Sequence, residues 1–202
     1  RMNNLVTGNM AYDDYGNILS KNADKKEIFY DAQYYSNNPY AIQKAKSNYE
    51  NLIAADQTIE YTTFDKMSYI VYGNNSLSID YGFDHERIHA EENVGGVMIE
   101  KTYVGDCEYV VTNGKTMIYT FLAGPMGVFA VCSTNEKGDN SILYVHKDHL
   151  NSWCLVTDDN GQVVQDVSFD AWGNLRNGDS WSGDYNGNLL CDRGFTRSRS
   201  EE

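Results

Sequence analysis

Two groups of histidines have a spacing that metal sites use. His146, Asp148 and His149 place two imidazoles and a carboxylate within four residues, and His85 and His89 are four residues apart. Imidazole and carboxylate groups are common ligands of transition metals. However, strand positions three apart point to opposite faces of a sheet, and the residues around His85 and His89 alternate as in a strand. Hydrogen bonding in turns and strands is therefore favoured, and no metal ion or other cofactor is predicted.

The candidate nucleophiles are Ser152, Cys154 and Cys132. Nucleophilic catalysis needs a neighbouring base and an oxyanion hole, and no Gly-x-Ser-x-Gly or similar elbow surrounds any of the three. The sequence therefore predicts a protein without catalytic activity. A hydrolase that uses Asp148 or His149 is the weaker alternative.

The four cysteines give little support for redox or zinc chemistry. Cys107, Cys132, Cys154 and Cys191 form no Cys-x-x-Cys pair, which argues against a zinc knuckle or a thioredoxin-type redox site. We expect buried free thiols, because cysteine in strand-like surroundings behaves as a small apolar residue. Disulfide bonds in an exported protein remain an open alternative.

An aromatic residue followed by Asp recurs along the chain. Its five copies are Tyr12-Asp13, Tyr30-Asp31, Phe64-Asp65, Phe83-Asp84 and Phe169-Asp170. Residues 12–18 and 169–175 share a longer pattern, in which Gly16 and Asn17 correspond to Gly173 and Asn174. In this pattern the aromatic residue ends a strand, Asp accepts backbone N–H groups across the turn, and Gly adopts positive φ. The repeat therefore predicts β-hairpins.

The elements that must position these residues are mostly strands. Asn113-Gly114 and Asn160-Gly161 predict two further hairpins. Alternation of apolar and polar residues predicts strands over residues 59–64, 69–72, 77–81, 97–104, 116–122 and 141–145, and the continuous apolar run at 128–132 predicts a buried strand. Residues 39–55 are the exception, since Asn38 and Pro39 suit a helix start. The apolar face of that short helix would contain Ile42, Ala45, Tyr49, Leu52 and Ile53.

Composition and charge narrow the class of protein. The 202 residues include 16 Tyr, 17 Gly and only 2 Pro, which favours strands joined by glycine turns. The formal charge is -13, from 16 basic and 29 acidic residues, and such a chain repels a phosphate backbone. No nucleic-acid partner is expected. No apolar stretch approaches the roughly 18 residues of a transmembrane helix, so no transmembrane segment is predicted.

The many tyrosines have two interpretations. Aromatic rings at one position of each repeat can form a ladder that fills the space between successive hairpins. Exposed tyrosines can also stack against sugars, because the ring is apolar and the hydroxyl is polar. We favour the ladder.

Several segments resemble, in order along the chain, the YD repeats and repeat-associated core of the Rhs family. Residues 61–66 are similar to the family's Tyr-Thr-x-Phe-Asp-Lys, and Tyr81, Gly82, Asp84 and Arg87 match its Tyr-Gly-x-Asp-x-x-Arg unit. The most specific segment is 144–152, followed by residues 156–164 and 169–175. The matching residues in this segment are Asp148, His149, Leu150 and Ser152, and Gly161 matches in the segment 156–164.

One position in this core departs from the family. Asn151 stands where the family usually has Gly. Asn is the commonest residue other than Gly that adopts positive φ, so we expect the turn to be retained.

The resemblance implies a fold and a function. Antiparallel YD-repeat hairpins would form a twisted β-strip or partial spiral shell over residues 1–196, followed by a disordered tail at 197–202. The chain would be a non-catalytic fragment of a bacterial, secreted or cell-surface shell that encloses a C-terminal toxin or effector. Its partners would be the remainder of the parent protein and that effector. The family's self-cleaving terminus contains Asp-Pro, and the chain has no Asp-Pro dipeptide, which implies a C-terminally truncated member.

A different class of function stays open. The chain would then be a cell-surface module that binds carbohydrate or a partner protein through aromatic strands or sheet edges. Unpaired sheet edges can also pair with a second copy, so self-association is a further alternative.

Overall fold

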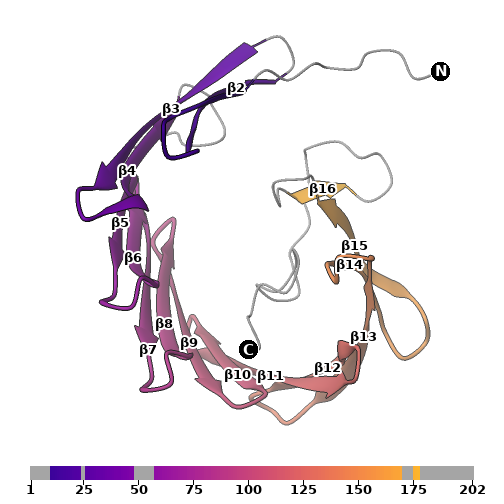
Figure 1. Ribbon diagram of the computed structural model, residues 1–202. Helices are drawn as coiled ribbons and strands as arrows, with labels where there is room; N and C mark the ends of the chain where they lie inside the picture. The colour runs from indigo at the N-terminus through magenta and orange to yellow at the C-terminus, as the bar shows by residue number, and fades with distance from the viewer. Residues whose placement is uncertain (1–9, 24–25, 48–56, 170–174, 178–202) are drawn as a thin grey trace, which may run out of the picture. The chain divides into compact units, whose positions relative to one another are not determined.

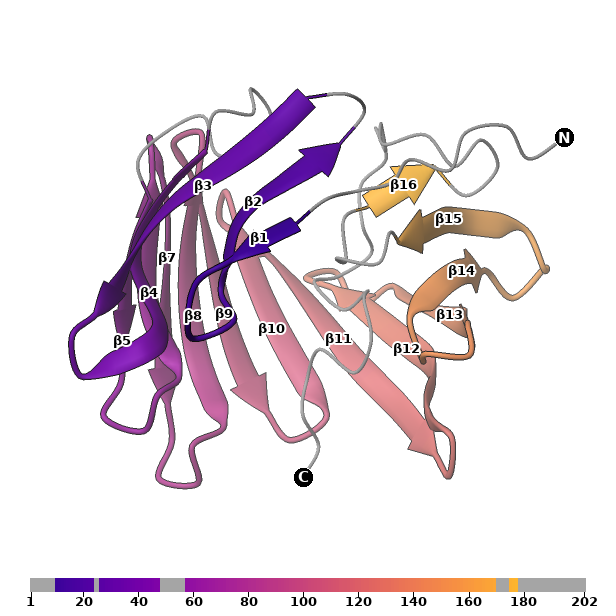
Figure 2. The same cartoon turned by 45° about the horizontal axis from the view of Figure 1, so that its top comes forward.

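The computed structural model describes residues 10–23, 26–47, 57–169 and 175–177. The chain divides into two compact units, residues 1–102 and 103–202, and each is described by itself. Figures 1 and 2 show strands that follow one another in chain order within each unit. The mainly-β prediction of antiparallel hairpins in a twisted sheet is confirmed. In the ranges given above, no helix has the length and apolar composition needed to cross a membrane.

Unit 1 is a meander in which each strand pairs antiparallel with the next. Its strands are β1 (Met10–Tyr12), β2 (Ile18–Ala23), β3 (Lys26–Tyr35), β4 (Asn38–Ser47), β5 (Gln57–Tyr61), β6 (Met67–Tyr72), β7 (Asn75–Tyr81), β8 (Arg87–Val94) and β9 (Val97–Val104). The loops that follow odd-numbered strands therefore lie together at one end of the strands, and the loops that follow even-numbered strands lie at the opposite end.

The two faces of unit 1 differ because its strands alternate. Ile79 pairs with Ala90, and Ala90 pairs with Lys101, so these three buried residues share one face. Neighbouring positions point to the opposite face, where Glu91 pairs with Glu100 and both are exposed. Burial of apolar side chains on one face is the main stabilising contribution to such a sheet.

The helix predicted over residues 39–55 is wrong for its described part. Residues 38–47 form β4, which pairs with β3 through Ala32 and Ala45 and with β5 through Lys44 and Thr58. The cap and the apolar spacing were local signals, and pairing with two neighbouring strands overrides them. Tyr49, Leu52 and Ile53 lie outside the described residues.

Unit 2 is a second antiparallel meander. Its strands are β10 (Cys107–Thr112), β11 (Lys115–Gly124), β12 (Gly127–Asn135), β13 (Asn140–Lys147), β14 (Trp153–Thr157), β15 (Val163–Phe169) and β16 (Leu175–Asn177). The strands predicted from alternation are confirmed in both units, except that the one predicted at 59–64 ends at Tyr61, where a turn begins. The tail predicted at 197–202 lies outside the described residues.

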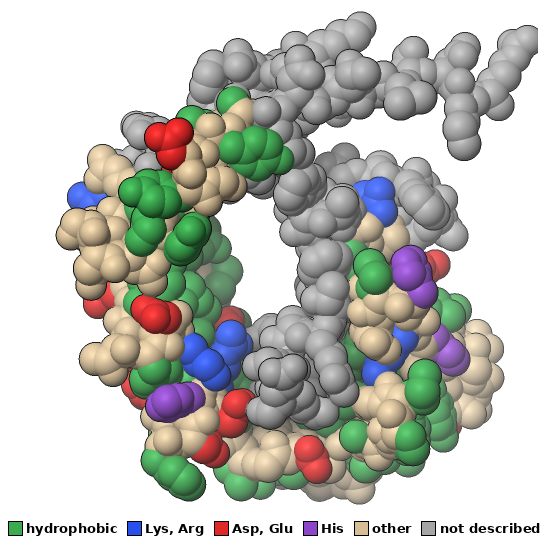
Figure 3. Space-filling view, viewed as in Figure 1, with side chains coloured by type: hydrophobic (Ala, Val, Ile, Leu, Met, Phe, Trp, Pro, Cys, Tyr) green, Lys and Arg blue, Asp and Glu red, His purple; other side chains and the backbone are tan. Residues whose placement is uncertain are grey.

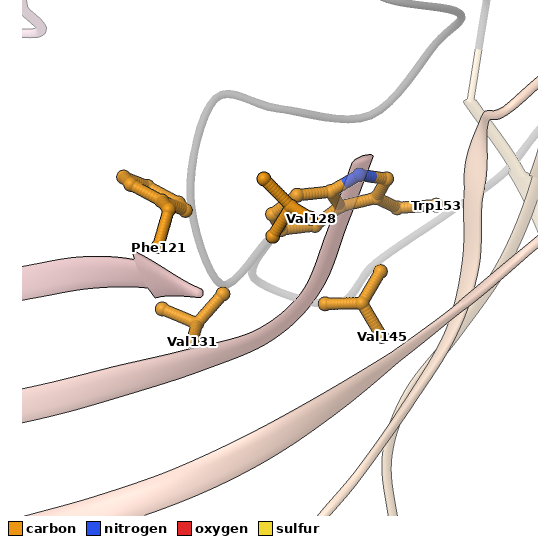
Figure 4. Close-up of a cluster of buried hydrophobic side chains, with 5 residues drawn as sticks. All are labelled: Phe121, Val128, Val131, Val145 and Trp153. Atoms are coloured by element: carbon orange, nitrogen blue, oxygen red, sulfur yellow. The ribbon is translucent and has the colours of Figure 1, made fainter. Parts of the chain in front are cut away.

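The core of unit 2 lies on one face of the sheet. Register pairs join Phe121 to Val131 and Val145 to Val156. Figure 4 shows the buried side chains of this core directed toward one another: Phe121, Val128, Val131, Val145 and Trp153. Val131 and Val156 are completely inaccessible to solvent. An apolar row across four strands therefore holds the unit together.

Both predicted Asn-Gly hairpins are present. Asn113 and Gly114 have φ of 52° and 73°, and Thr112 pairs with Lys115, as in a two-residue type I′ turn. At Asn160-Gly161 the hairpin is confirmed, but the loop is longer, because Thr157 pairs with Val163.

We predict that Phe121→Ala lowers the free energy of unfolding by about 3–5 kcal/mol, because it leaves a cavity in the core of unit 2. Phe129, in β12, is 52% exposed and provides the matched control. Phe129→Ala should cost less than about 1 kcal/mol. Denaturant titration of both variants measures the difference, and equal losses would contradict the placement of the core.

Candidate functional site: a row of hairpin loops

One five-residue loop recurs in both units. In each copy the N–H of the first residue donates to the C=O of the fifth, and the N–H of the fourth donates to the C=O of the first. In the copy at 148–152 these distances are 3.0 Å and 3.1 Å. This is a type I turn followed by a left-handed residue, a common hairpin connection. The copies are 13–17, 62–66, 82–86, 135–139, 148–152 and 158–162.

The fourth residue of every copy has positive φ. It is Gly in three copies, and elsewhere it is Asp65, His85 or Asn151, with φ of 61°, 64° and 65°. The expectation that Asn151 replaces Gly without loss of the turn is confirmed. A residue with a Cβ at positive φ costs on the order of 1 kcal/mol, so these three positions need compensating contacts.

The side chain of the first residue holds the loop closed. Asp148 Oδ1 accepts the backbone N–H of Leu150 at 2.8 Å and of Ser152 at 2.9 Å. Asp13, Asn135 and Asp158 make the equivalent pair of bonds to the third and fifth residues. This oxygen accepts hydrogen bonds from two backbone N–H groups that would otherwise lack a partner within the turn.

The first YD copy has the geometry that its sequence predicted. Tyr12 ends β1, Asp13 accepts the N–H groups of Tyr15 and Asn17, and Gly16 has a φ of 87°. The Asn17 side-chain amide donates to Asp13 Oδ2 at 2.8 Å. That bond, together with backbone N–H donors, holds the pKa of the Asp13 carboxyl below its ordinary value of 3.8.

The other aromatic-Asp dipeptides are not equivalent to the first. Phe64-Asp65 occupies the third and fourth loop positions, and Phe83-Asp84 occupies the second and third. Tyr30-Asp31 lies within β3, opposite β4. The equivalence assumed from sequence is wrong here, because the turn depends on its first and fourth residues. Phe169 pairs with Leu175, but Asp170 and Gly173 lie outside the described residues.

The loop at 82–86 begins with Gly82, and its neighbours leave little room for a side chain there. A Cβ on Gly82 would lie 2.9 Å from Asp84 Oδ1 and 3.2 Å from Ile88 Cγ2. With no side chain at the first position, Asp84 Oδ1 instead accepts the N–H of Glu86 at 3.1 Å. Tyr81 and Arg87 form the register pair that closes this loop.

Aromatic rings connect successive loops of unit 1. Tyr15 meets Tyr40 edge to face at 6.3 Å, and Phe64 meets Tyr81 in the same way at 5.5 Å. Phe64 also stacks on the His85 ring at 4.1 Å, which offsets the cost of positive φ at that residue. Ring contacts between successive hairpins, which the ladder favoured from the sequence requires, are present in unit 1, but these rings come from different positions of the repeat.

Hydrogen bonds run along the same edge. Asn17 Nδ2 donates to the C=O of Pro39 at 3.1 Å, Asn38 Nδ2 donates to Asp65 Oδ1 at 3.3 Å, and Lys66 Nζ donates to the C=O of His85 at 2.6 Å. Each bond joins a loop that follows one odd-numbered strand to the loop that follows the next odd-numbered strand. We call the loops 13–17, 36–40, 62–66 and 82–86 the loop row.

In unit 2, the segment 144–152, which resembles the Rhs repeat-associated core, contains a loop with both exposed and buried residues. Ser152 is fully buried, Leu150 is 51% exposed, and His149 is exposed at the loop. His146 lies in β13, where its Nε2 is 3.1 Å from Thr157 Oγ1. The two histidines therefore have separate surroundings. Over the described residues, no group of three His, Cys, Asp or Glu side chains is arranged to hold a metal ion.

The described cysteines are free thiols. Cys107, Cys132 and Cys154 are half-buried and form no disulfide, and Cys191 lies outside the described residues. Burial raises the pKa of the Cys154 thiol, which lowers its thiolate fraction. The geometry gives Cys154 no feature of an activated nucleophile.

Sequence reasoning missed three polar side-chain contacts between strands of unit 1. His89 lies between Asp80, at 3.5 Å from its Nδ1, and Glu100, at 3.3 Å from its Nε2. Lys101 Nζ contacts Glu92 Oε1 at 2.7 Å on the buried face. Cross-strand register decides all three contacts, and no local motif indicates it.

Comparison with known proteins adds evidence on the fold. No family model and no curated protein matches the chain. In the crystal structure of TcdB2-TccC3-TEV, 10% of one chain aligns with 83% of this chain, with a TM-score of 0.59 and 13% identity. This chain shares the fold of that part of TcdB2-TccC3.

Two related structures give the same result. TcdB2-TccC3-Cdc42 and TcdB2-TccC3 each align with 83% of this chain at a TM-score of 0.52, with 11% and 10% identity. The aligned parts are 12% and 14% of those chains. The chain thus spans about a tenth of the length of the first structure's chain, and the likeness shows the fold alone.

We predict that Asp148→Ala destabilises unit 2 by about 1–2 kcal/mol, because two backbone N–H groups lose their acceptor. Asp148→Asn should be nearly neutral, since Asn135 makes the same two bonds in another loop. Denaturant titration compares the variants. Equal destabilisation by Asn and Ala would show that the side-chain oxygen does not hold the loop.

Acid should loosen the first hairpin loop of unit 1. A carboxyl with a lowered pKa contributes stability that is complete above its ordinary value of 3.8 and is lost as the pH falls through its folded pKa. In Asn17→Ala the pKa of Asp13 should rise toward that ordinary value. NMR titration of the Asp13 carboxyl measures the change, and an unchanged midpoint would contradict the role of Asn17.

Proposed function

We propose that this chain forms part of the wall of an Rhs-type shell, which encloses and presents a C-terminal toxin or effector in competition between cells. The observation that carries the proposal is the set of Rhs-like sequence segments, in a chain of which 83% aligns with part of TcdB2-TccC3. Low identity limits that likeness to fold, so the function depends on the sequence segments that resemble the Rhs family.

The arrangement of the family-like segments supports the proposal. The segment around Tyr81 and Arg87 and the segment at 148–152 both form the recurrent closed loop. These motifs therefore have a structural purpose, because they fix the connection between paired strands. A wall needs many such connections and no reactive centre.

The two faces of each sheet also suit a wall. In unit 2, Leu143 and Val145 are buried on one face of β13, while Ile142, Tyr144 and His146 on the other face are exposed. A wall separates two environments. Because side chains alternate along each strand, one face of the sheet is buried and the other is exposed. We further propose that the chain is non-catalytic and that its parent protein is secreted or displayed at the cell surface. Its partners would be the rest of that parent and its effector.

Protease protection in the complete reading frame that encodes this chain tests the proposal. The segment that follows should resist protease in the intact protein. Phe121→Asp places a charge in the core of unit 2, and it should speed cleavage of that segment at least about tenfold by opening the wall.

Phe129→Asp is the control for the added charge, because Phe129 is exposed. It should leave the protection unchanged. The proposal fails if the following segment is cleaved equally fast with and without Phe121→Asp, or if the reading frame encodes no such segment.

A further inference from the structure

Phe83 is the most exposed large apolar residue of the loop row. Its side chain is 100% exposed, at the second position of the loop 82–86. The same position in the other five loops holds a polar residue: Asp14, Thr63, Glu136, His149 or Asp159. Turn geometry therefore does not require an aromatic ring here. Burying such a side chain against another molecule would contribute about 1.5–3 kcal/mol.

Two more exposed aromatic residues lie on the same edge. Tyr15 and Tyr40 are 60% and 68% exposed and hold each other edge to face. Consecutive loops of the row are two strands apart, which is about 10 Å, so the row extends over roughly 30 Å. Tyr15 and Tyr40 lie toward one end of the row and Phe83 at the other, so a partner that contacts all three must follow the row.

Hydrogen bonds and ring contacts hold the loops of the row together. The loop that carries Phe83 is closed by bonds from Gly82 N to Glu86 O at 2.8 Å and from His85 N to Gly82 O at 3.0 Å. The neighbouring loop is tied to it through Lys66 and the stacked Phe64 and His85 rings. Little conformational entropy would be lost on binding, which favours recognition.

The loop row carries more acidic than basic side chains. Asp14, Asp65, Asp84 and Glu86 are exposed on it, against Lys66, which lies 4.0 Å from Glu86, and Arg87, which follows the last loop. Figure 3 shows hydrophobic, acidic, basic and histidine side chains exposed together over the strands of unit 1. A second copy, with its own charge of -13, and an anionic membrane would both be repelled. A basic partner would be attracted.

We propose that the loop row is a docking surface for a basic segment of a partner protein, with Phe83 as the anchor that enters an apolar pocket. Aromatic anchors inside a charged rim are characteristic of protein interfaces. This proposal does not depend on the wall function, because it concerns one edge of the sheet.

A library of random peptides displayed on phage is the probe. Selection against the full chain should enrich peptides that combine Lys or Arg with a large apolar residue. Phe83→Ser should weaken their binding at least about tenfold, while circular dichroism stays unchanged because the side chain is fully exposed. The double variant Asp14→Asn, Glu86→Gln should weaken binding less and reduce its salt dependence.

Met98 supplies the matched control. It is 55% exposed and lies in β9 close to the opposite edge of the sheet, so Met98→Ser should leave peptide binding unchanged. Three results would overturn the proposal: no peptide is enriched, the enriched peptides bind Phe83→Ser equally well, or Met98→Ser weakens binding as much. Binding of neutral oligosaccharides or phosphatidylcholine vesicles through Phe83, without peptide binding, would also overturn it.

Discussion

The hydrogen bonds from one side-chain oxygen to two backbone N–H groups hold four of the hairpin loops closed. Asp13, Asn135, Asp148 and Asp158 each make this pair of bonds at the start of a loop. Closing the loop this way sets which residues face each other in the two strands. Because a shift of one residue would turn every side chain to the other face, loop closure also decides which residues are buried.

Packing between hairpins depends on that register. In unit 2, the pairing of Lys147 with Trp153 brings Trp153 to the core face with Val145 and Phe121. In unit 1, loop closure places Phe64 against Tyr81 and His85 of the following hairpin. Local hydrogen bonds, cross-strand pairs and ring contacts thus agree, and such agreement between levels is what selects one structure for a sequence.

Much of the fold follows from local sequence signals. Alternation located the strands, Asn113-Gly114 predicted a type I′ hairpin, and the tolerance of Asn for positive φ predicted the conformation of Asn151. Each of these signals acts within a few residues. The helix prediction over 39–55 failed because β4 is held by two neighbouring strands, whose pairing cannot be read from its own residues.

The loop row was less predictable. The Phe64-Asp65 and Phe83-Asp84 dipeptides look like Tyr12-Asp13, yet they fall at other loop positions. The true signal is an acceptor or Gly at the first position with a residue that tolerates positive φ three places later. The exposure of Phe83 and the contact between Lys66 and His85 depend on neighbouring hairpins, which the spacing within one repeat does not reveal.

Hydrogen exchange of individual backbone amides tests the central claim most directly. The account predicts slowed exchange for the third and fifth residues of the loops that begin at Asp13, Asn135, Asp148 and Asp158. Leu150 and Ser152 are examples, because their N–H groups donate to Asp148. In Asp148→Ala these two amides should exchange faster, while those of the loop at 158–162 stay protected. If Leu150 and Ser152 exchange in the native protein as fast as in an unfolded chain, the loops do not set the fold.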